Sequence, residues 1–197
     1  MADWLVTEAY RRLKRGPQVI LPKDIGLILG YSGIGKHSRC IDAGTGSGWL
    51  AVSLARVAAD VVSYDTREDF IAIAKKNAAM LQLDNLELKV GDFSKRVGEK
   101  SASFDLVTLD MPNSDKCLRN AMRLLKPGGM VVGYLPHSEQ LSKFVATMEK
   151  LGFEKIFSLE PIIRDMLVRS DGTRPSTKGV WHTAYLSFGF KPQAKLV

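Results

Sequence analysis

The feature that most constrains how this chain can fold is the alternation of short β-rich runs with helical patterns. The strand candidates are Arg39–Asp42, Val61–Tyr64, Leu86–Val90, Asp105–Leu109 and Met130–Tyr134, each bounded by Gly, Asp or Pro. The helical patterns are Trp4–Lys14, Gly48–Ala58, Glu68–Gln82, Ser114–Leu125 and Ser138–Leu151. The regular alternation after residue 39 predicts a parallel sheet with helices on both faces.

The C-terminal part of the sequence breaks this alternation. Two further strand candidates, Lys155–Glu160 and Thr183–Phe190, follow each other with no good helical pattern between them. A final antiparallel pair added to a parallel α/β sheet is the arrangement of the Rossmann-like class I methyltransferases. We therefore expect a seven-stranded sheet that is mostly parallel, with a C-terminal antiparallel strand.

The segment between these last two strands, roughly residues 163–181, is much longer than an ordinary hairpin loop, so function or disorder should explain it. Its basic residues are Arg164, Arg169, Arg174 and Lys178. Basic side chains of this kind bind nucleic-acid phosphates, but a flexible solvated loop would have a similar composition. The sequence leaves both interpretations open.

A glycine-rich turn follows the first strand candidate. Residues 42–48 read Asp-Ala-Gly-Thr-Gly-Ser-Gly, and glycines allow the chain to turn tightly and to approach a ligand closely. A dinucleotide fingerprint would need Gly or Ala at position 49, where Trp49 stands instead. The pattern favours a cofactor without a pyrophosphate, S-adenosylmethionine. The expected contacts in this turn are Asp42, Gly44, Thr45, Gly46, Ser47, Gly48 and Trp49.

Acidic residues also follow the next three strand candidates. Asp65 follows the second and can accept hydrogen bonds from both ribose hydroxyls. Gly91 and Asp92 follow the third, where a carboxylate can accept from an adenine amino group and Phe93 can lie beside the ring. Asp110 follows the fourth, over the methyl donor. Ordinary strand-ending turns are the other explanation of these residues.

The chain is basic and has no signature of a metal, membrane or secreted protein. It has 28 Lys and Arg against 21 Asp and Glu, a formal net charge of +7. This balance favours a polyanionic partner such as RNA, although a merely basic surface would give the same number. No apolar run has membrane-spanning length, and the N-terminus lacks a signal core. The cysteines and histidines lack metal-ligand spacing, so we expect a cytoplasmic protein without a metal.

Several motifs together resemble the tRNA (adenine-N1)-methyltransferase family, whose members act on T-loop adenines conventionally numbered 57 and 58. The matching segments are residues 15–24, 42–49, 64–70, 109–113, 125–129, 174–175 and 182–186. Three of the motifs are specific to the family in combination: Pro22-Lys23-Asp24, Arg67-Glu68-Asp69-Phe70 and Asp110-Met111-Pro112. The resemblance covers nearly the whole chain from Arg15 onward.

The resemblance implies a chemistry and a set of contacts. The enzyme would use S-adenosyl-L-methionine, release S-adenosyl-L-homocysteine and methylate N1 of an adenine in tRNA. Asp110 would be catalytic, accepting a hydrogen bond from the exocyclic amine of the base. The additional cofactor contacts would be Gln18, Ile20, Thr66 and Asp110 itself. The tRNA contacts would be Tyr31, Pro112, Arg164, Arg169, Arg174 and Lys178.

The resemblance also bears on domain organisation and assembly. Family members usually carry a small β-rich domain ahead of the catalytic one, whereas only residues 1–14 precede the match here. We therefore expect that domain to be absent and residues 1–197 to form a single methyltransferase domain. Residues 1–38 would be an N-terminal extension over the cofactor cleft. A homotetramer is the expected assembly, because the family is commonly tetrameric.

Two other functions fit parts of the sequence. A small-molecule methyltransferase, such as a precorrin methyltransferase, has a similar length and fold. A corrinoid carbon acceptor, however, needs no carboxylate beside an amine. A non-catalytic RNA-binding partner subunit would keep the fold and lose the cofactor, which the intact glycines, Asp65, Asp92 and Asp110 argue against.

Overall fold

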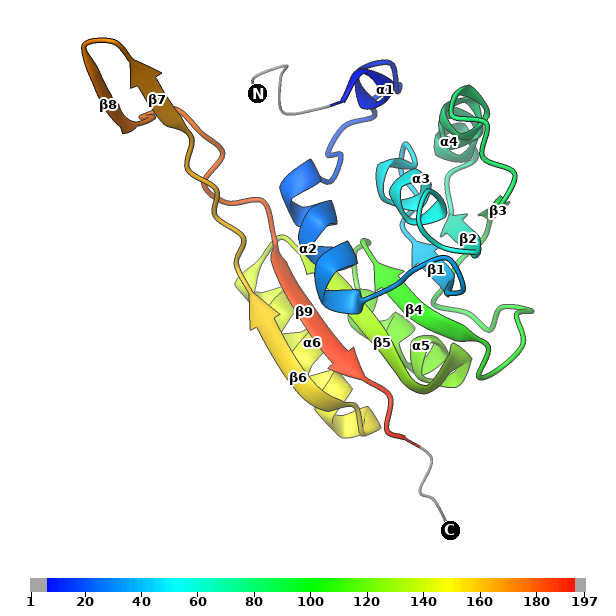
Figure 1. Ribbon diagram of the computed structural model, residues 1–197. Helices are drawn as coiled ribbons and strands as arrows, with labels where there is room; N and C mark the ends of the chain where they lie inside the picture. Colours follow the sequence, from blue (N-terminus) through cyan, green and yellow to red (C-terminus); the bar gives the residue numbers. More distant parts are fainter. Residues whose placement is uncertain (1–6, 194–197) are drawn as a thin grey trace.

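The computed structural model describes residues 7–193 of the chain. Its centre is a seven-stranded sheet in the order β3-β2-β1-β4-β5-β9-β6 (Figure 1). The strands are β1 (Arg39–Ala43), β2 (Asp60–Asp65), β3 (Leu86–Val90), β4 (Phe104–Leu109), β5 (Leu125–Leu135), β6 (Glu154–Leu159) and β9 (Tyr185–Phe190). Strand β9 runs antiparallel to β5 and β6, and the pairs among β1 to β5 are parallel. The expected class I methyltransferase sheet is confirmed, with β5 beginning at Leu125 rather than at Met130.

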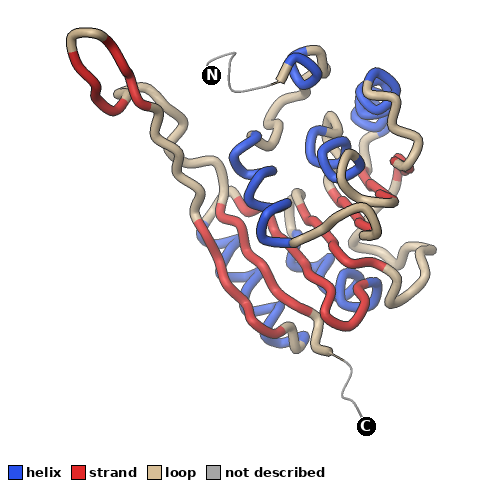
Figure 2. Tube along the Cα trace, in the orientation of Figure 1, coloured by secondary structure: helices blue, strands red, loops and turns tan. Residues whose placement is uncertain are grey.

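Helices cover both faces of this sheet (Figure 2). On one face lie α2 (Pro22–Ser32), α3 (Trp49–Ala55) and α4 (Glu68–Met80). On the other lie α5 (Leu118–Leu124), which follows the 3-10 turn η2 (Ser114–Cys117), and α6 (Ser138–Leu151). Within residues 7–193, no helix is both long and apolar enough to cross a membrane.

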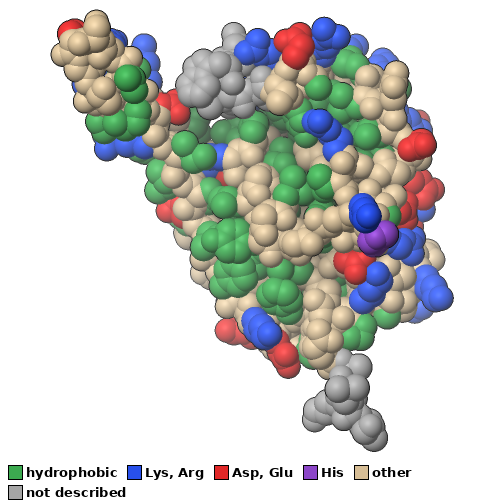
Figure 3. All heavy atoms as spheres, in the orientation of Figure 1, with side chains coloured by type: hydrophobic (Ala, Val, Ile, Leu, Met, Phe, Trp, Pro, Cys, Tyr) green, Lys and Arg blue, Asp and Glu red, His purple; other side chains and the backbone are tan. Residues whose placement is uncertain are grey.

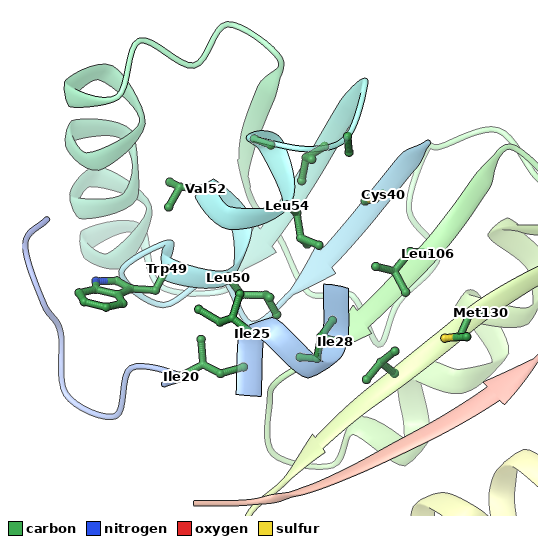
Figure 4. Packing of buried hydrophobic residues seen from close by; sticks show 14 of the residues in the cluster. Ile20, Ile25, Ile28, Cys40, Trp49, Leu50, Val52, Leu54, Leu106 and Met130 are labelled. Carbon is green, nitrogen blue, oxygen red and sulfur yellow. The ribbon is translucent and has the colours of Figure 1, made fainter. Parts of the chain in front are cut away.

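The core has two halves because successive strand residues point to opposite faces of the sheet. Cys40 and Leu106 pack beneath α2 and α3 with Ile25 and Ile28, the half that Figure 4 shows from close by. Ile41, the next residue of β1, packs in the other half, against α5 and α6. Both faces of the central strands are therefore buried, and the buried residues of these strands are mostly apolar, apart from polar ones such as Asp42, Ser63 and Thr108.

The N-terminal region differs from its prediction. Helix α1 spans only Glu8–Arg11, and residues 4–6 of the expected Trp4–Lys14 helix lie outside the described residues. The chain leaves the helix at Arg12 and buries Leu13 in the core. Helix α2, in contrast, was not predicted. It contains Gly26 and Gly30, which weaken a helix intrinsically, and burial of Ile25 and Ile28 compensates for that loss.

The long segment between β6 and β9, residues 161–183, is here called the arm. It contains a two-stranded antiparallel hairpin, β7 (Met166–Arg169) and β8 (Gly172–Pro175), that projects away from the sheet (Figures 1 and 2). Part of the arm thus has regular secondary structure. Its exposed apolar side chains are Ile162, Ile163, Met166, Val168, Val180 and Trp181.

Candidate active site

The carboxyl ends of β1, β2 and β4 meet at one edge of the sheet, and the glycine-rich turn lies between them. The backbone N–H groups of Gly44 and Thr45 donate to the Tyr64 carbonyl of β2 at 2.8 and 3.0 Å. On the other side, the Asp110 N–H donates to the Ala43 carbonyl at 2.8 Å. The turn is therefore held by hydrogen bonds on the sides of both neighbouring strands. Asp110, the first residue after β4, lies beside it.

Two glycines of this turn lie where no other residue fits. At Gly44, with φ +97°, an added Cβ would lie 1.8 Å from the Asp110 carbonyl oxygen. At Gly48, with φ +85°, it would lie 2.9 Å from Cβ of Ala74 on α4. Both positive φ angles favour glycine as well. The glycines thus allow the turn to pack closely against β4 and α4. Because Gly44, Gly46 and Gly48 have no side chains, they add no atoms to the space above the strand ends.

Asp42 lies beneath the turn, with its side chain buried. Its carboxylate accepts hydrogen bonds from Ser63 Oγ at 2.6 Å and Thr108 Oγ1 at 2.9 Å, and Ser63 Oγ lies 2.6 Å from Thr45 Oγ1. Burial raises the pKa of Asp42 to about 6, and the two hydroxyl donors oppose that rise. Through these hydrogen bonds the Asp42 side chain connects β1 with β2 and β4. Its carboxylate also contributes negative charge below the turn.

Asp65 connects the end of β2 with the turn. It accepts hydrogen bonds from Gly46 N–H at 2.9 Å, from Arg67 N–H at 3.0 Å and from Arg67 Nε at 3.2 Å. Burial would raise the pKa of Asp65, but these donors bring it below its usual value. The Arg67 guanidinium also stacks over the Phe70 ring at 3.6 Å. Asp65 is therefore an ionised carboxylate held at the rim of the turn, with Thr66 exposed beside it.

Asp110 adds a third carboxylate at this edge. Burial, together with the negative charges of Asp42 and Asp65, raises its pKa to about 8. Tyr134, at the end of β5, has its own pKa raised by burial and by the carboxylates of Asp24 and Asp110. A space bounded by acidic groups and a side-chain-free turn fits a cationic ligand. The sulfonium of S-adenosylmethionine meets this requirement.

The end of β3 agrees only in part with its prediction. Asp92 is partly exposed, and one of its oxygens accepts from Ser94 N–H at 2.9 Å and from Ser94 Oγ at 2.6 Å, which lowers its pKa. Phe93 is fully buried and packs against Tyr64 at 5.6 Å between ring centroids. The expectation that its ring lies beside a bound base is therefore corrected, because the ring belongs to the core.

Residues of the N-terminal extension reach the turn. Gly16 lies over it, since a Cβ added there would be 3.5 Å from Cβ of Ser47. Trp49 is buried and its Nε1 donates to the Lys14 carbonyl at 3.4 Å. Gln18 is exposed with a positive φ of 61°, whereas Ile20 is buried in the core (Figure 4). Of these two expected cofactor contacts, only Gln18 has an exposed side chain.

The expected tRNA contacts lie in three places. Pro112 is exposed immediately after the acidic edge. Tyr31 is half-exposed and packs against Phe157 and Phe188, at ring distances of 5.7 and 5.5 Å, so the structure does not bring it to the glycine-rich turn. The remaining four are exposed on the arm, where basic and apolar side chains gather (Figure 3): Arg164, Arg169, Arg174 and Lys178.

The structure also shows that Lys23 and Asp24, two residues of the Pro22-Lys23-Asp24 motif, form a buried ion pair. Lys23 Nζ lies 2.7 Å from Asp24 Oδ1 and also donates to the Pro161 carbonyl at 2.8 Å and to Thr183 Oγ1 at 2.7 Å. Pro161 and Thr183 are the two ends of the arm. One lysine at the start of α2 therefore fixes both ends of the arm close to Tyr134 and the acidic edge.

Comparison with known proteins identifies the family. The methyltransferase domain family matches residues 34–169 of this chain. A relative from Methanocaldococcus jannaschii, the tRNA (adenine(57)-N(1)/adenine(58)-N(1))-methyltransferase, is 32% identical over 96% of this chain and 77% of its own length. The chain belongs to the tRNA (adenine-N1)-methyltransferase family. It is an S-adenosylmethionine-dependent class I methyltransferase, which speaks against the alternative of a non-catalytic subunit.

Solved structures agree with this membership. A tRNA (m1A58) methyltransferase from Aquifex aeolicus is 29% identical, with a TM-score of 0.86 over 93% of this chain and 74% of that chain. A SAM-dependent O-methyltransferase from Thermotoga maritima is 28% identical, with a TM-score of 0.88 over 98% and 73%. A precorrin-6y C5,15-methyltransferase from Geobacter metallireducens shares the fold at 13% identity, and this likeness supports the fold alone.

The charge of the site predicts how a methyltransferase of this family responds to pH. Without a ligand, Asp110 is protonated below its pKa of about 8. A cationic ligand favours the ionised form, so binding releases a proton. Affinity for S-adenosylmethionine should rise by up to about tenfold per pH unit from about pH 6 to 8 and then level off.

Calorimetry across this pH range provides the measurement. S-adenosylhomocysteine lacks the sulfonium charge, so its affinity should change less over the same range. The variant Asp110→Asn should flatten the rise seen with S-adenosylmethionine. An equal pH dependence for the two compounds would contradict the proposed interaction.

Proposed function

We propose that this chain methylates N1 of an adenine in the tRNA T-loop, at position 58 and possibly also at position 57. The observation that carries the proposal is the 32% identity, over 96% of the chain, with a relative whose name states this activity. The acidic edge with Asp110 beside the glycine-rich turn is consistent with it. The precorrin alternative is supported by a shared fold at 13% identity.

The cofactor would lie over the glycine-rich turn. When bound, S-adenosylmethionine supplies an electrophilic methyl group on a cationic sulfur. Asp65 would accept from the ribose hydroxyls and Asp92 from the adenine amino group, through the oxygen that Ser94 leaves free. Gly44, Gly46 and Gly48 leave the space for it, with Gln18 and Thr66 at its border. The released product would be S-adenosylhomocysteine.

The acceptor needs orientation more than activation. Adenine N1 carries a neutral lone pair at neutral pH, so no base has to remove a proton before it attacks, and most of the rate would come from in-line placement. Asp110, ionised beside the cationic cofactor, would accept a hydrogen bond from the exocyclic amine. The same carboxylate would stabilise the positive charge that develops on the ring. The target base would have to leave its stack in the tRNA, at a cost of about a few kcal/mol.

Product mapping tests the function directly. Unmodified tRNA is incubated with the protein and isotopically labelled S-adenosylmethionine, digested to nucleosides and fragments, and analysed by mass spectrometry. We expect labelled N1-methyladenosine in T-loop fragments. Confirmed cofactor binding without this product would refute the acceptor, and turnover of a corrinoid precursor would favour the small-molecule alternative.

The arm is the proposed contact with tRNA phosphates. Its four basic residues are exposed, and each phosphate contact releases counterions, so affinity should fall steeply with salt. The double substitution Arg169→Ala/Arg174→Ala should reduce the slope of log affinity against log salt by about 2. Filter binding at several salt concentrations measures this slope.

A matched control removes the same charge elsewhere. Lys143 and Lys150 are exposed on α6, which covers the sheet away from the arm. The double substitution Lys143→Ala/Lys150→Ala should leave the slope nearly unchanged. Equal salt slopes for the two double variants would show that the arm is not part of the tRNA interface.

Three further properties are proposed, and of these the assembly rests on the family resemblance. Residues 1–197 would act as a single methyltransferase domain, with residues 1–38 extending over the cofactor cleft, and Gly16 lying over Ser47 supports this arrangement. The assembly would be a homotetramer and the location the cytoplasm. Sedimentation at equilibrium would determine the assembly, and a mass other than four chains would exclude the tetramer.

A further inference from the structure

The N-terminal extension is fastened to the glycine-rich turn through one buried amide. Asn77 of α4 is fully buried, on the helix face that carries Ala74 and Ala78. Its Oδ1 accepts from the Lys14 N–H at 2.8 Å. Its Nδ2 donates to the Lys14 carbonyl at 2.9 Å and to the Ser47 carbonyl of the turn at 2.8 Å. A single side chain therefore binds both backbone groups of Lys14 and the turn together.

Other contacts hold the same stretch of chain, residues 14–20, here called the strap. Trp49 donates to the Lys14 carbonyl, and the Arg15 guanidinium lies 5.3 Å from the centre of the Trp49 ring. A Cβ added at Gly16 would lie 2.9 Å from Cε1 of Phe70, a residue that Arg67 connects to Asp65. The strap thus rests on the turn and on the first residues of α3 and α4.

The chemistry of position 77 requires an amide. One oxygen must accept while one nitrogen donates twice, and both protons of the Asn77 amide are used. An aspartate of the same shape could accept from Lys14 N–H but could not make both donations. It would leave the buried Ser47 carbonyl without this donor and the Lys14 carbonyl with only the 3.4 Å bond from Trp49 Nε1, and an unpaired buried carbonyl is costly. The strap would then lose its attachment while the shape of the core stayed the same.

We propose that Asn77 is a positioning residue for the cofactor. It closes the strap over the glycine-rich turn, so that cofactor affinity depends on a side chain that lies below the turn and outside the expected cofactor contacts. The inference rests on the proposed cofactor site. If binding requires the closed strap, any fraction of open strap weakens the apparent affinity in proportion.

The test compares two isosteric substitutions, Asn77→Asp and Asn85→Asp. Asn85 Nδ2 donates to the carbonyls of Ala55 and Ala58 at 2.8 and 3.0 Å, so Asn85→Asp also removes two donations, but at the far end of α3. Thermal unfolding measures the loss of stability in each variant. Calorimetry with S-adenosylhomocysteine measures affinity, and limited trypsin cleavage after Lys14 and Arg15 measures opening of the strap.

We expect Asn77→Asp to weaken S-adenosylhomocysteine binding by about ten- to hundredfold and to speed cleavage in the strap. Asn85→Asp should change affinity by less than about twofold even where it lowers the melting temperature comparably. Unchanged affinity in Asn77→Asp, or an equal loss in Asn85→Asp, would overturn the role. If the wild-type protein itself binds no S-adenosylhomocysteine, the proposed cofactor site fails as well.

A second variant leaves Asn77 in place and covers the case in which Asn77→Asp does not fold. Gly16→Ala adds a methyl group 2.9 Å from the Phe70 ring, at a partly exposed position outside the core. It should lift the strap from the turn, so cleavage after Arg15 should accelerate and affinity should fall. Normal cofactor affinity together with faster cleavage would show that cofactor binding does not depend on the closed strap, and would overturn the proposal.

Discussion

Replacing Gly44 with alanine should abolish cofactor binding and destabilise the fold by about 3 kcal/mol or more. The added Cβ would lie 1.8 Å from the Asp110 carbonyl oxygen, at a φ of +97° that alanine rarely adopts. Relief of this clash requires the turn to leave β4 and breaks its hydrogen bonds to Tyr64 or Asp110. Thermal unfolding and calorimetry with S-adenosylhomocysteine would measure both effects.

Gly30→Ala is the matched control for this substitution. Gly30 is exposed on α2, and nothing lies within 4 Å of an added Cβ. Alanine there should stabilise the protein by up to about 1 kcal/mol through its better helix propensity, without changing cofactor affinity. A Gly44→Ala protein that melts and binds like wild type would contradict the described packing of the turn.

Replacing Asp110 with alanine should reduce methyl transfer to tRNA by about 10²- to 10³-fold. The proposed reason is that the carboxylate orients the exocyclic amine and stabilises the positive charge on the ring. The backbone of Asp110 packs against Gly44, and alanine keeps that backbone in place. Affinity for S-adenosylhomocysteine, which carries no sulfonium, should therefore stay within about threefold of wild type.

Single-turnover assays with saturating cofactor separate transfer from binding. Asp84→Ala, at an exposed position after α4, removes the same charge away from the acidic edge and should leave the rate unchanged. Retained turnover in Asp110→Ala would refute the catalytic role. A parallel loss of S-adenosylhomocysteine binding would assign Asp110 to cofactor binding instead.

The regular part of the fold could be predicted because local patterns determine it. Strand β3 and helix α6 have the predicted boundaries, since each is bounded by local signals: β3 by Gly91, and α6 by His137 and Gly152. The glycine-rich turn was equally clear from its spacing. Phe93 shows the limit of this approach, because a position next to a strand end does not tell whether the ring points to the cleft or to the core.

Other parts depend on contacts between distant segments. Helix α2 forms because Ile25 and Ile28 are buried, which outweighs its glycines. Lys23 reaches Thr183, 160 residues away, and Asn77 reaches Lys14, 63 residues away. One signal for Asn77 was present in the sequence: a polar residue stands between Ala74 and Ala78 on an otherwise apolar helix face. Its partners could be found only from the structure.

Lys23, which forms a buried ion pair with Asp24, connects the arm to the body of the protein. Lys23 is bonded to both ends of the arm, and its partner Asp24 is fully buried. Pulling the arm away would leave the ion pair on α2 but would break the two hydrogen bonds that Lys23 donates to Pro161 and Thr183, at a cost of about 1.5–3 kcal/mol for each bond. Both ends of the arm are therefore attached to α2 at its base. A force applied at its tip would be transmitted as leverage onto α2, the helix that begins beside Tyr134 and the acidic edge.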